Sequence, residues 1–286
     1  MEVFSNDATH AGLAARHRSS DIVLLAFRSA HAHPARKSTQ TTWKAACMID
    51  IEDLVKKQIA LFRAYDIRAS HEPRPGRGKE GDLSYGPYLL ISREKGAGGT
   101  AVAQAVGRRL GWQVFDHEIV DKIAQKAQVR RQLIESLDER AQATIQSIVG
   151  QILHPEEIGT PGYLAHLKEI VLALGHQGNV IIVGRGARYL LPTQFGVNAR
   201  LVAPIVIRTQ RIAHEQHLSL AAARTQVETA DHERAELVRR HFGHDVADPL
   251  GHDLTINTAE LSIEAAAEVV LIALQQKLAV KPKPRG

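Results

Sequence analysis

Cysteine, aromatic residues and long apolar runs are all scarce in this chain of 286 residues. The single cysteine, Cys47, excludes an internal disulfide and a cysteine-ligated zinc site, as is usual in a reducing compartment. Aromatic residues make up only 5% of the chain, so we expect an aliphatic core. The longest early apolar run, residues 22–27, is far shorter than the roughly 20 residues of a membrane-spanning helix. Because the N-terminus also lacks the apolar segment of a secretory signal, we expect a cytoplasmic protein that makes no membrane contact.

The charge balance is basic, with a formal net charge of +5, while 44% of the residues are hydrophobic and 23% are charged. These fractions are those of an ordinary globular protein that is long enough to bury a core. A basic surplus attracts phosphate groups, whether they belong to a nucleotide, a nucleic acid or a lipid. Nucleic acid is the weaker prediction, because the chain has no aromatic residues interleaved with its basic residues and no recognisable reader motif.

The chain divides into four stretches of different composition. Residues 1–47 are rich in Ala, His, Arg and Ser without periodicity, and we expect them to be disordered or a spurious upstream extension. Residues 48–84 begin with a short helix from about Ile51 and continue as a linker rich in Pro, Gly and charge. We therefore predict a domain boundary near residue 84, a main domain over 85–278 and a basic tail over 279–286.

Short apolar runs alternate with amphipathic helices throughout the predicted main domain. Five of these runs are predicted to be strands, over residues 88–92, 113–116, 179–183, 200–203 and 253–257. Continuous apolar strands separated by helices indicate an α/β fold with a parallel sheet flanked by helices. Such sheets bind their ligands at the carboxyl ends of the strands.

The first candidate site lies between the first predicted strand and the next helix, in Ile91-Ser-Arg-Glu-Lys-Gly-Ala-Gly-Gly-Thr100. A glycine-rich turn there lets backbone N–H groups point at a phosphate, assisted by the positive end of the helix dipole. Aligned with the Walker pattern G-x-x-x-x-G-K-[ST], the segment keeps Gly98 and Thr100. It has Arg93 at the first glycine of the pattern and Gly99 at the lysine. The alternative interpretation is a tight strand-to-helix turn that binds nothing.

A second glycine-rich loop, Val183-Gly-Arg-Gly-Ala-Arg188, follows the clearest of the predicted strands. An arginine flanked by glycines at the carboxyl end of a strand can bind a phosphate with two parallel hydrogen bonds. The alternative is that Gly184 and Gly186 merely shape the turn while Arg185 is solvated. Two such loops at one edge of a parallel sheet favour a shared phosphate site.

The third candidate is the helical segment from Asp231 to Arg240, which also contains Arg234 and Arg239. Its charges fit a solvated helix face with ion pairs three residues apart. They also fit a mobile lid whose arginines close over a phosphate during its transfer. The sequence alone leaves both interpretations open.

Together these three segments, with Asp116, resemble the cytidylate kinase-like family of P-loop nucleoside-monophosphate kinases in their order and spacing. The resemblance covers about residues 86–278. It implies a P-loop NTPase-type sheet of five parallel strands, a helical insertion that binds the nucleoside monophosphate, and a lid. It also implies ATP and Mg²⁺ as cofactors and a nucleotide as the substrate, whereas the sequence has no signature of an oligomeric state.

The resemblance assigns roles to individual residues. Those that would cradle the donor phosphates are Gly96, Ala97, Gly98, Gly99 and Thr100. Those that would contact the acceptor are Asp116, Gly184, Arg185 and Gly186, and those that would contact Mg²⁺ are Thr100 and Asp116. Those that would act in catalysis are Arg93, Lys95, Asp116, Arg185, Arg234, Arg239 and Arg240.

Two departures from the family pattern bear on activity. Cytidylate kinases have the Walker lysine where this chain has Gly99, and an aspartate that helps to read cytosine where it has Gly186. Loss of one phosphate-directed cation costs on the order of 3 kcal/mol, or about a hundredfold in rate, unless Arg93 or Lys95 replaces it. We predict ATP-dependent phosphoryl transfer to a CMP- or dCMP-like nucleoside monophosphate or a related small phosphorylated acceptor. The alternative is a non-catalytic nucleotide-binding regulatory module with a degenerate Walker loop.

Overall fold

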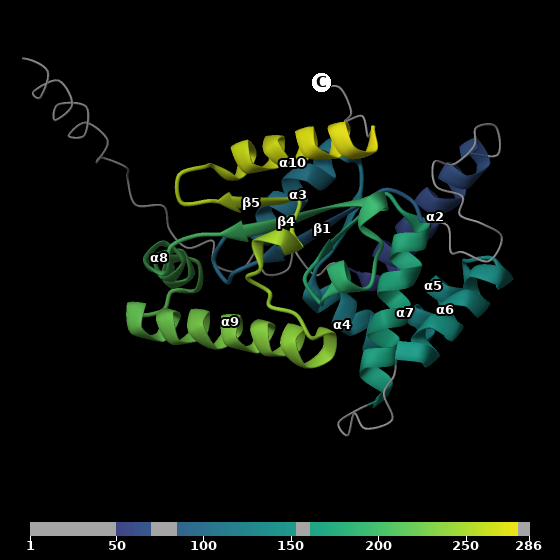
Figure 1. The fold of residues 1–286 in the computed structure, drawn as a ribbon, viewed down its shortest axis with the longest axis horizontal. Helices are drawn as coiled ribbons and strands as arrows, with labels where there is room; N and C mark the ends of the chain where they lie inside the picture. Colours follow the sequence, from purple (N-terminus) through teal and green to yellow (C-terminus); the bar gives the residue numbers. More distant parts are fainter. Residues whose placement is uncertain (1–49, 70–84, 153–160, 280–286) are drawn as a thin grey trace, which may run out of the picture. The chain divides into compact units, whose positions relative to one another are not determined.

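The structure is a computed structural model and describes residues 50–69, 85–152 and 161–279. Its centre is a five-stranded parallel sheet in the order β2-β3-β1-β4-β5 (Figure 1). The strands are β1 (Tyr88–Arg93), β2 (Gln113–Phe115), β3 (Val180–Val183), β4 (Gly196–Val202) and β5 (Leu254–Asn257). The predicted α/β class and the parallel sheet of five strands are therefore confirmed.

Strand β4 begins four residues before the predicted strand. Gly196 and Asn198 are poor strand formers, and their presence makes this stretch look like a loop in the sequence. In the fold β4 pairs with β1 along its length, from Tyr88 opposite Gly196 to Arg93 opposite Leu201. The backbone pairing with a central strand thus overrides the local preference.

The sheet is covered on both faces, and successive residues of β1 show how the two layers are built. Leu89 and Ile91 pack into one aliphatic cluster with α3 (Gly99–Leu110) and α10 (Ile263–Leu278). Tyr88 and Leu90 point to the opposite face, because side chains alternate along a strand, and belong to a second cluster. In Figure 1 the sheet lies between α10 and α9 (Leu220–Phe242).

Between β2 and β3, where the resemblance implies a helical insertion, the described residues form four helices. They are α4 (His117–Gln125), α5 (Ala127–Glu135), α6 (Glu139–Ile152) and α7 (Pro161–Gln177). Their inner faces are fully buried at Leu133, Ile145, Leu167 and Ile170. The second cluster is built largely from these helices and supports the loop that follows β3.

Helix α2 (Ile51–Ala69) packs on the same cluster through Ile51 and Val55. The Gln58 side-chain amide also donates a hydrogen bond to the Gly178 carbonyl, 3.0 Å away. The described helix therefore belongs to one compact unit with the sheet, and the boundary predicted near residue 84 does not separate them. The predictions for residues 1–47, the linker and the basic tail beyond Ala279 lie outside the described residues.

Two helices connect β4 to β5: α8 (Ile205–Gln216) and the 23-residue α9. A small apolar cluster of Ile212, Ala223 and Val227 joins them. The segment predicted as a lid, Asp231–Arg240, is the second half of α9. Three short 3₁₀ turns complete the described chain, at Ala187–Tyr189, Thr193–Phe195 and Pro249–Gly251. In the described ranges, every helix is too short or too polar to cross a membrane.

Candidate functional site

Two pockets adjoin one another at the carboxyl edge of the sheet. The loop pocket, of about 620 Å³, lies over the glycine loop and the start of α3. The sheet pocket, of about 530 Å³, lies between the sheet, the loop after β3 and α9. The residues that line both pockets are Arg93, Lys95, His117 and Arg234. The two glycine loops therefore line neighbouring pockets, with three cations and a histidine where the pockets meet.

The glycine loop has the geometry of an anion site. Gly96 and Gly98 have φ values of +80° and +78°, a left-handed conformation that disfavours any side chain. A Cβ on Gly98 would also lie 2.7 Å from the Cδ1 atom of Ile263. Gly98 is the N-cap of α3 and has no side chain to bind the first N–H groups of that helix. These groups and the helix dipole are therefore directed at the loop pocket.

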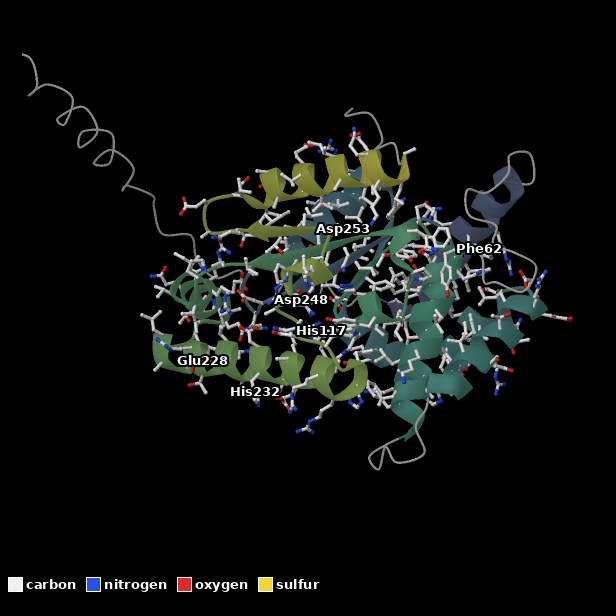
Figure 2. All side chains as sticks on the ribbon, viewed as in Figure 1. Phe62, His117, Glu228, His232, Asp248 and Asp253 are labelled. Atoms are coloured by element: carbon white, nitrogen blue, oxygen red, sulfur yellow. The ribbon has the colours of Figure 1, made fainter. Side chains whose placement is uncertain are left out.

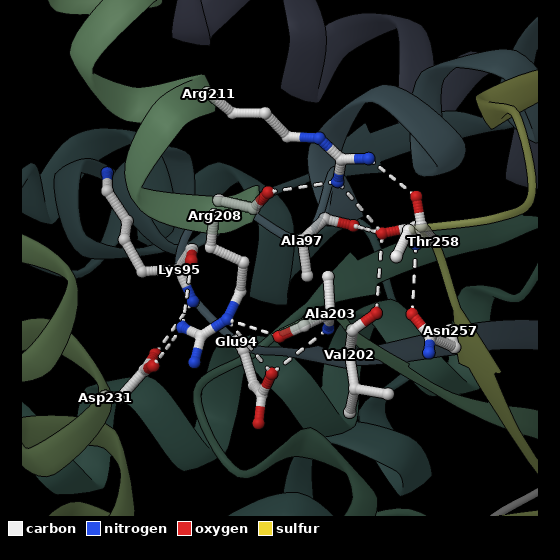
Figure 3. A network of polar contacts seen from close by, with 12 residues as sticks. Glu94, Lys95, Ala97, Val202, Ala203, Arg208, Arg211, Asp231, Asn257 and Thr258 are labelled. Carbon is white, nitrogen blue, oxygen red and sulfur yellow. Dashed lines mark hydrogen bonds and ion pairs between the residues drawn. The ribbon is translucent and has the colours of Figure 1, made fainter. Parts of the chain in front are cut away.

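Side chains from α8 hold the carbonyl groups of the glycine loop (Figure 3). Arg208 donates to the Lys95 carbonyl at 3.1 Å, and Arg211 donates to the Gly96 carbonyl at 3.3 Å. Arg211 also donates to the Thr258 carbonyl at 2.6 Å. Because these carbonyl oxygens are bound from outside, the loop conformation is preset, and within it the Ala97 N–H donates to the Glu94 carbonyl at 3.2 Å. This support could not be predicted from the sequence, because Arg208 and Arg211 lie more than a hundred residues from the loop.

Helix α9 is joined to the same loop through Asp231 (Figure 3). One carboxylate oxygen accepts from the Lys95 N–H at 2.7 Å and from Arg234 at 3.2 Å. The other oxygen binds Arg208. The predicted lid residue Asp231 is therefore a link between α9 and the glycine loop rather than part of a solvated face.

The side chain of Arg93 packs against Gly99, the position of the lysine in the Walker pattern. A Cβ on Gly99 would lie 2.8 Å from both Cβ and Cγ of Arg93, and a Cβ on Gly184 would collide with its guanidinium. The arginine thus runs from above the lysine position of the Walker pattern to the loop after β3. Burial first, and then the nearby charges of Arg234 and Arg185, lower the pKa of Arg93 to about 10. It is still a cation at neutral pH, placed where the two pockets meet.

His117 is a site residue that the sequence analysis missed. It is the first residue of α4, directly after Asp116, and Figure 2 shows it between the sheet and α9. Its Nδ1 atom lies 3.0 Å from Arg93 Nη2, and the ring nitrogen must accept because a guanidinium can only donate. Burial, followed by the charges of Arg93 and Arg185, lowers the pKa of His117. The neutral ring therefore orients Arg93.

Arg185 is held in a strained loop. Its φ of +55° lies between Gly184 at +85° and Gly186 at +65°, and an arginine in this left-handed region costs about 1–2 kcal/mol. The guanidinium pairs with Asp121, which also accepts from the Tyr163 hydroxyl at 2.6 Å. The insertion helices α4 and α7 thus fix the predicted phosphate arginine. Strain maintained at a strand's carboxyl end is typical of a functional loop.

Gly186 departs from the family pattern for a structural reason. It has a left-handed φ, and a Cβ at this position would collide with the ring of Phe242 at the end of α9. That ring stacks on Tyr189 at a centroid distance of 5.2 Å. An aspartate at position 186 would therefore require Phe242 to move.

The two residues predicted to contact Mg²⁺ are placed differently. Thr100 lines the loop pocket. Asp116 lines neither pocket, and one of its oxygens caps α4 by accepting from the N–H groups of Glu118 and Ile119 at 3.1 and 3.0 Å. Within the described ranges, no three His, Cys, Asp or Glu side chains gather into a metal cluster.

Of the three arginines predicted to act from the lid, the structure brings Arg234 to the site. Burial is the main cause that lowers its pKa, while its pairing with Asp231 raises it. Arg239 and Arg240 instead pair with Glu236, and their side chains are 68% and 70% exposed. These two arginines lie outside both pockets in this structure, and their catalytic role stays a prediction.

Comparison with known proteins finds a matching family model and relatives that are named after the same activity. Residues 89–260 match the cytidylate kinase-like family. The chain is 30% identical to a cytidylate kinase of Sulfolobus acidocaldarius over 109 residues, which are 38% of this chain and 60% of that protein. It is 26% identical to a cytidylate kinase of Ignicoccus hospitalis over 183 residues, which are 64% of this chain and 95% of that protein.

Two solved structures resemble the chain more distantly. An uncharacterized protein from Eubacterium ventriosum is 15% identical, with a TM-score of 0.47 over 66% of this chain and 98% of its own. A shikimate kinase from Acinetobacter baumannii is 17% identical, with a TM-score of 0.39 over 68% of this chain and 96% of its own. At such TM-scores the likeness does not bear on activity.

Proposed function

Because the chain belongs to the cytidylate kinase-like family, we propose that it transfers a phosphoryl group from ATP·Mg²⁺ to a nucleoside monophosphate. CMP and dCMP are the preferred acceptors in this proposal, and a related small phosphorylated acceptor is the broader class. The observation that carries the proposal is the meeting of two pockets at Arg93, Lys95, His117 and Arg234. The relatives named cytidylate kinase support the acceptor class.

In this proposal the donor and acceptor occupy different pockets. The donor phosphates bind N–H groups of the glycine loop and of the first turn of α3, at Gly96 and at residues 98–100. The acceptor phosphate binds Arg185 in the sheet pocket. The transferred group then lies at the junction, between Arg93 and Arg234. Phosphoryl transfer needs positioning and charge rather than a covalent nucleophile, and this arrangement offers both.

The protein's cations act on charge that spreads over the transferred group. Arg93 stands in for the Walker lysine, because its side chain passes over Gly99 and ends between the pockets. Arg234 approaches from α9 and is oriented by Asp231. Mg²⁺ would neutralise the donor phosphates, with Thr100 as its ligand from this chain.

A non-catalytic nucleotide-binding module is the second candidate, and the glycine at position 99 is the observation in its favour. Such a module would bind ATP in the loop pocket without transfer. The position of Arg93 weighs against it, since a cation is still present at the junction.

A coupled ADP-release assay with ATP·Mg²⁺ tests the proposal against CMP, dCMP, UMP, AMP and GMP. Arg185→Ala removes the acceptor cation, and Arg224→Ala is the matched control because Arg224 is exposed and paired with Glu228 on α9. Turnover with a cytidine nucleotide that falls at least about a hundredfold in Arg185→Ala, and not in Arg224→Ala, is expected. Absence of turnover with every acceptor, despite measurable ATP binding, would favour the non-catalytic module.

A further inference from the structure

Five side chains that line the sheet pocket each carry a buried polar atom that has no hydrogen-bond partner within the described protein. These atoms are Nε of Arg185, Nε of Arg188, Oδ1 of Asn198, Oε1 of Gln226 and Nδ1 of His252. A buried polar atom without a partner costs about 1–3 kcal/mol, so folded proteins seldom gather several at one place. The pocket is therefore arranged for a polar ligand.

Three of these residues meet around Gly251, at the wall of the pocket formed by the turn before β5. The Asn198 side-chain amide donates to the Gly251 carbonyl at 2.8 Å, and His252 is the next residue in the chain. A Cβ on Gly251 would lie 2.9 Å from Nη2 of Arg188. We call Arg188, Asn198 and His252 the Gly251 corner.

The hydrogen-bonding character of two atoms in this corner is determined by their neighbours. Asn198 is 5% exposed, and because its Nδ2 is used as a donor, the unpartnered Oδ1 is an acceptor. His252 Nε2 lies 3.3 Å from the Val246 carbonyl, which can only accept, so Nε2 carries the proton. Nδ1 then carries a lone pair and can accept a hydrogen bond. Burial is the largest cause that lowers the pKa of His252, which favours this neutral form.

The remaining atom of the corner, Nε of Arg188, is a donor. The corner therefore offers two acceptors and one donor to a bound molecule. Cytosine presents an amino group beside an unprotonated ring nitrogen, which matches a site of acceptors beside a donor. Uracil presents a carbonyl beside an N–H group, which reverses the pattern.

We propose that the Gly251 corner selects the base of the acceptor nucleotide, with Asn198 and His252 accepting hydrogen bonds from an exocyclic amino group. The inference rests on the proposed function, since it places the acceptor in the sheet pocket. It moves base selection away from position 186, where cytidylate kinases have an aspartate and this chain has Gly186. A pocket of about 530 Å³ is within the usual range for a small-molecule ligand.

The test is equilibrium binding of CMP and UMP, measured by calorimetry without ATP, so that its result does not depend on turnover. The wild type is expected to bind CMP roughly tenfold to a hundredfold more tightly than UMP, because UMP leaves buried acceptors unpaired. His252→Phe and Asn198→Leu should each reduce this ratio to within a few fold of one. His232→Phe is the matched control, because His232 lies on the outer side of α9 (Figure 2) and should preserve the ratio.

Thermal melting of each variant verifies that it is folded. Because there are two independent variants, the test can still be made if one of them does not fold. A CMP-to-UMP ratio that both variants leave unchanged, or a wild type that prefers UMP, would overturn the inference. Binding of ribose 5-phosphate as tight as that of CMP would overturn it too, since hydroxyl groups would then satisfy the corner. If CMP is preferred through this corner but never phosphorylated, the inference stands and the proposed function fails.

Discussion

Because Arg93 packs against Gly99, the effect of Gly99→Ala on stability is predicted to change sign when Arg93 is replaced. Gly99 is the first residue of α3, where alanine should stabilise the helix by at most about 1 kcal/mol. In this chain, however, a Cβ on Gly99 would lie 2.8 Å from both Cβ and Cγ of Arg93. Overpacking of this kind costs about 1–3 kcal/mol, so Gly99→Ala should destabilise the wild type.

Replacing Arg93 by glycine removes both atoms that collide, whereas alanine would leave Cβ in place. In the Arg93→Gly background, Gly99→Ala should therefore be neutral or stabilising. At about 2–4 °C per kcal/mol for a domain of this size, Gly99→Ala should lower the melting temperature by roughly 2–12 °C in the wild type. It should not lower the melting temperature in the Arg93→Gly background. Thermal unfolding of the four proteins in this double-mutant cycle measures the difference.

The same pair of positions can restore the Walker pattern. Arg93→Gly removes one preorganised cation and should lower kcat by about a hundredfold, corresponding to roughly 3 kcal/mol. Adding Gly99→Lys places a lysine in the space that Arg93 has left, and we expect recovery of at least tenfold over the single variant. An equal effect of Gly99→Ala in both backgrounds, together with no recovery by lysine, would refute the idea that Arg93 replaces the Walker lysine.

Three further predictions concern the elements around the site. Gly186→Ala should lower the melting temperature by several degrees, because position 186 has a left-handed φ and a Cβ there collides with Phe242. Adding Phe242→Ala should recover part of the loss. A Gly186→Ala variant that is more stable than the wild type would contradict the described loop. Asp231→Asn should raise KM for ATP severalfold in steady-state assays, since it weakens the bond to the Lys95 N–H; an unchanged KM would show that this link is not needed. The pKa of His117 is lowered in the fold, so the unfolded chain binds more protons than the folded chain as pH falls below about 6.5, and stability is lost there. His117→Gln should therefore reduce the dependence of the melting temperature on pH between pH 7 and 5. An unchanged dependence would exclude His117 as its source.

Much of the architecture follows from local pattern. The apolar runs of β1 and β3 are buried on both faces, as in any sheet covered by helices, and the sequence shows them as continuous runs. Gly96, Gly98 and Gly184 could also be located, because only a turn that needs left-handed residues concentrates glycine in this way.

Contacts between distant segments could not be predicted in the same way. His117 looks like an ordinary first residue of a helix, and only the fold brings it to Arg93. Asn198 and Gly251 are 53 residues apart, and their hydrogen bond depends on the register of β4 beside β5. The charge of Arg239 suggested a lid residue from the sequence, whereas in the fold its side chain is exposed to solvent on α9.

Direct detection of the transferred phosphate tests the central claim most plainly. ATP labelled in its γ-phosphate would be incubated with Mg²⁺, CMP and the wild type or Arg93→Gly, and the products separated by chromatography. Label in CDP with the wild type, reduced about a hundredfold by the substitution, is the predicted result. Label that stays in ATP, in a protein that binds both nucleotides, would contradict the claim that the two pockets meet to transfer a phosphoryl group.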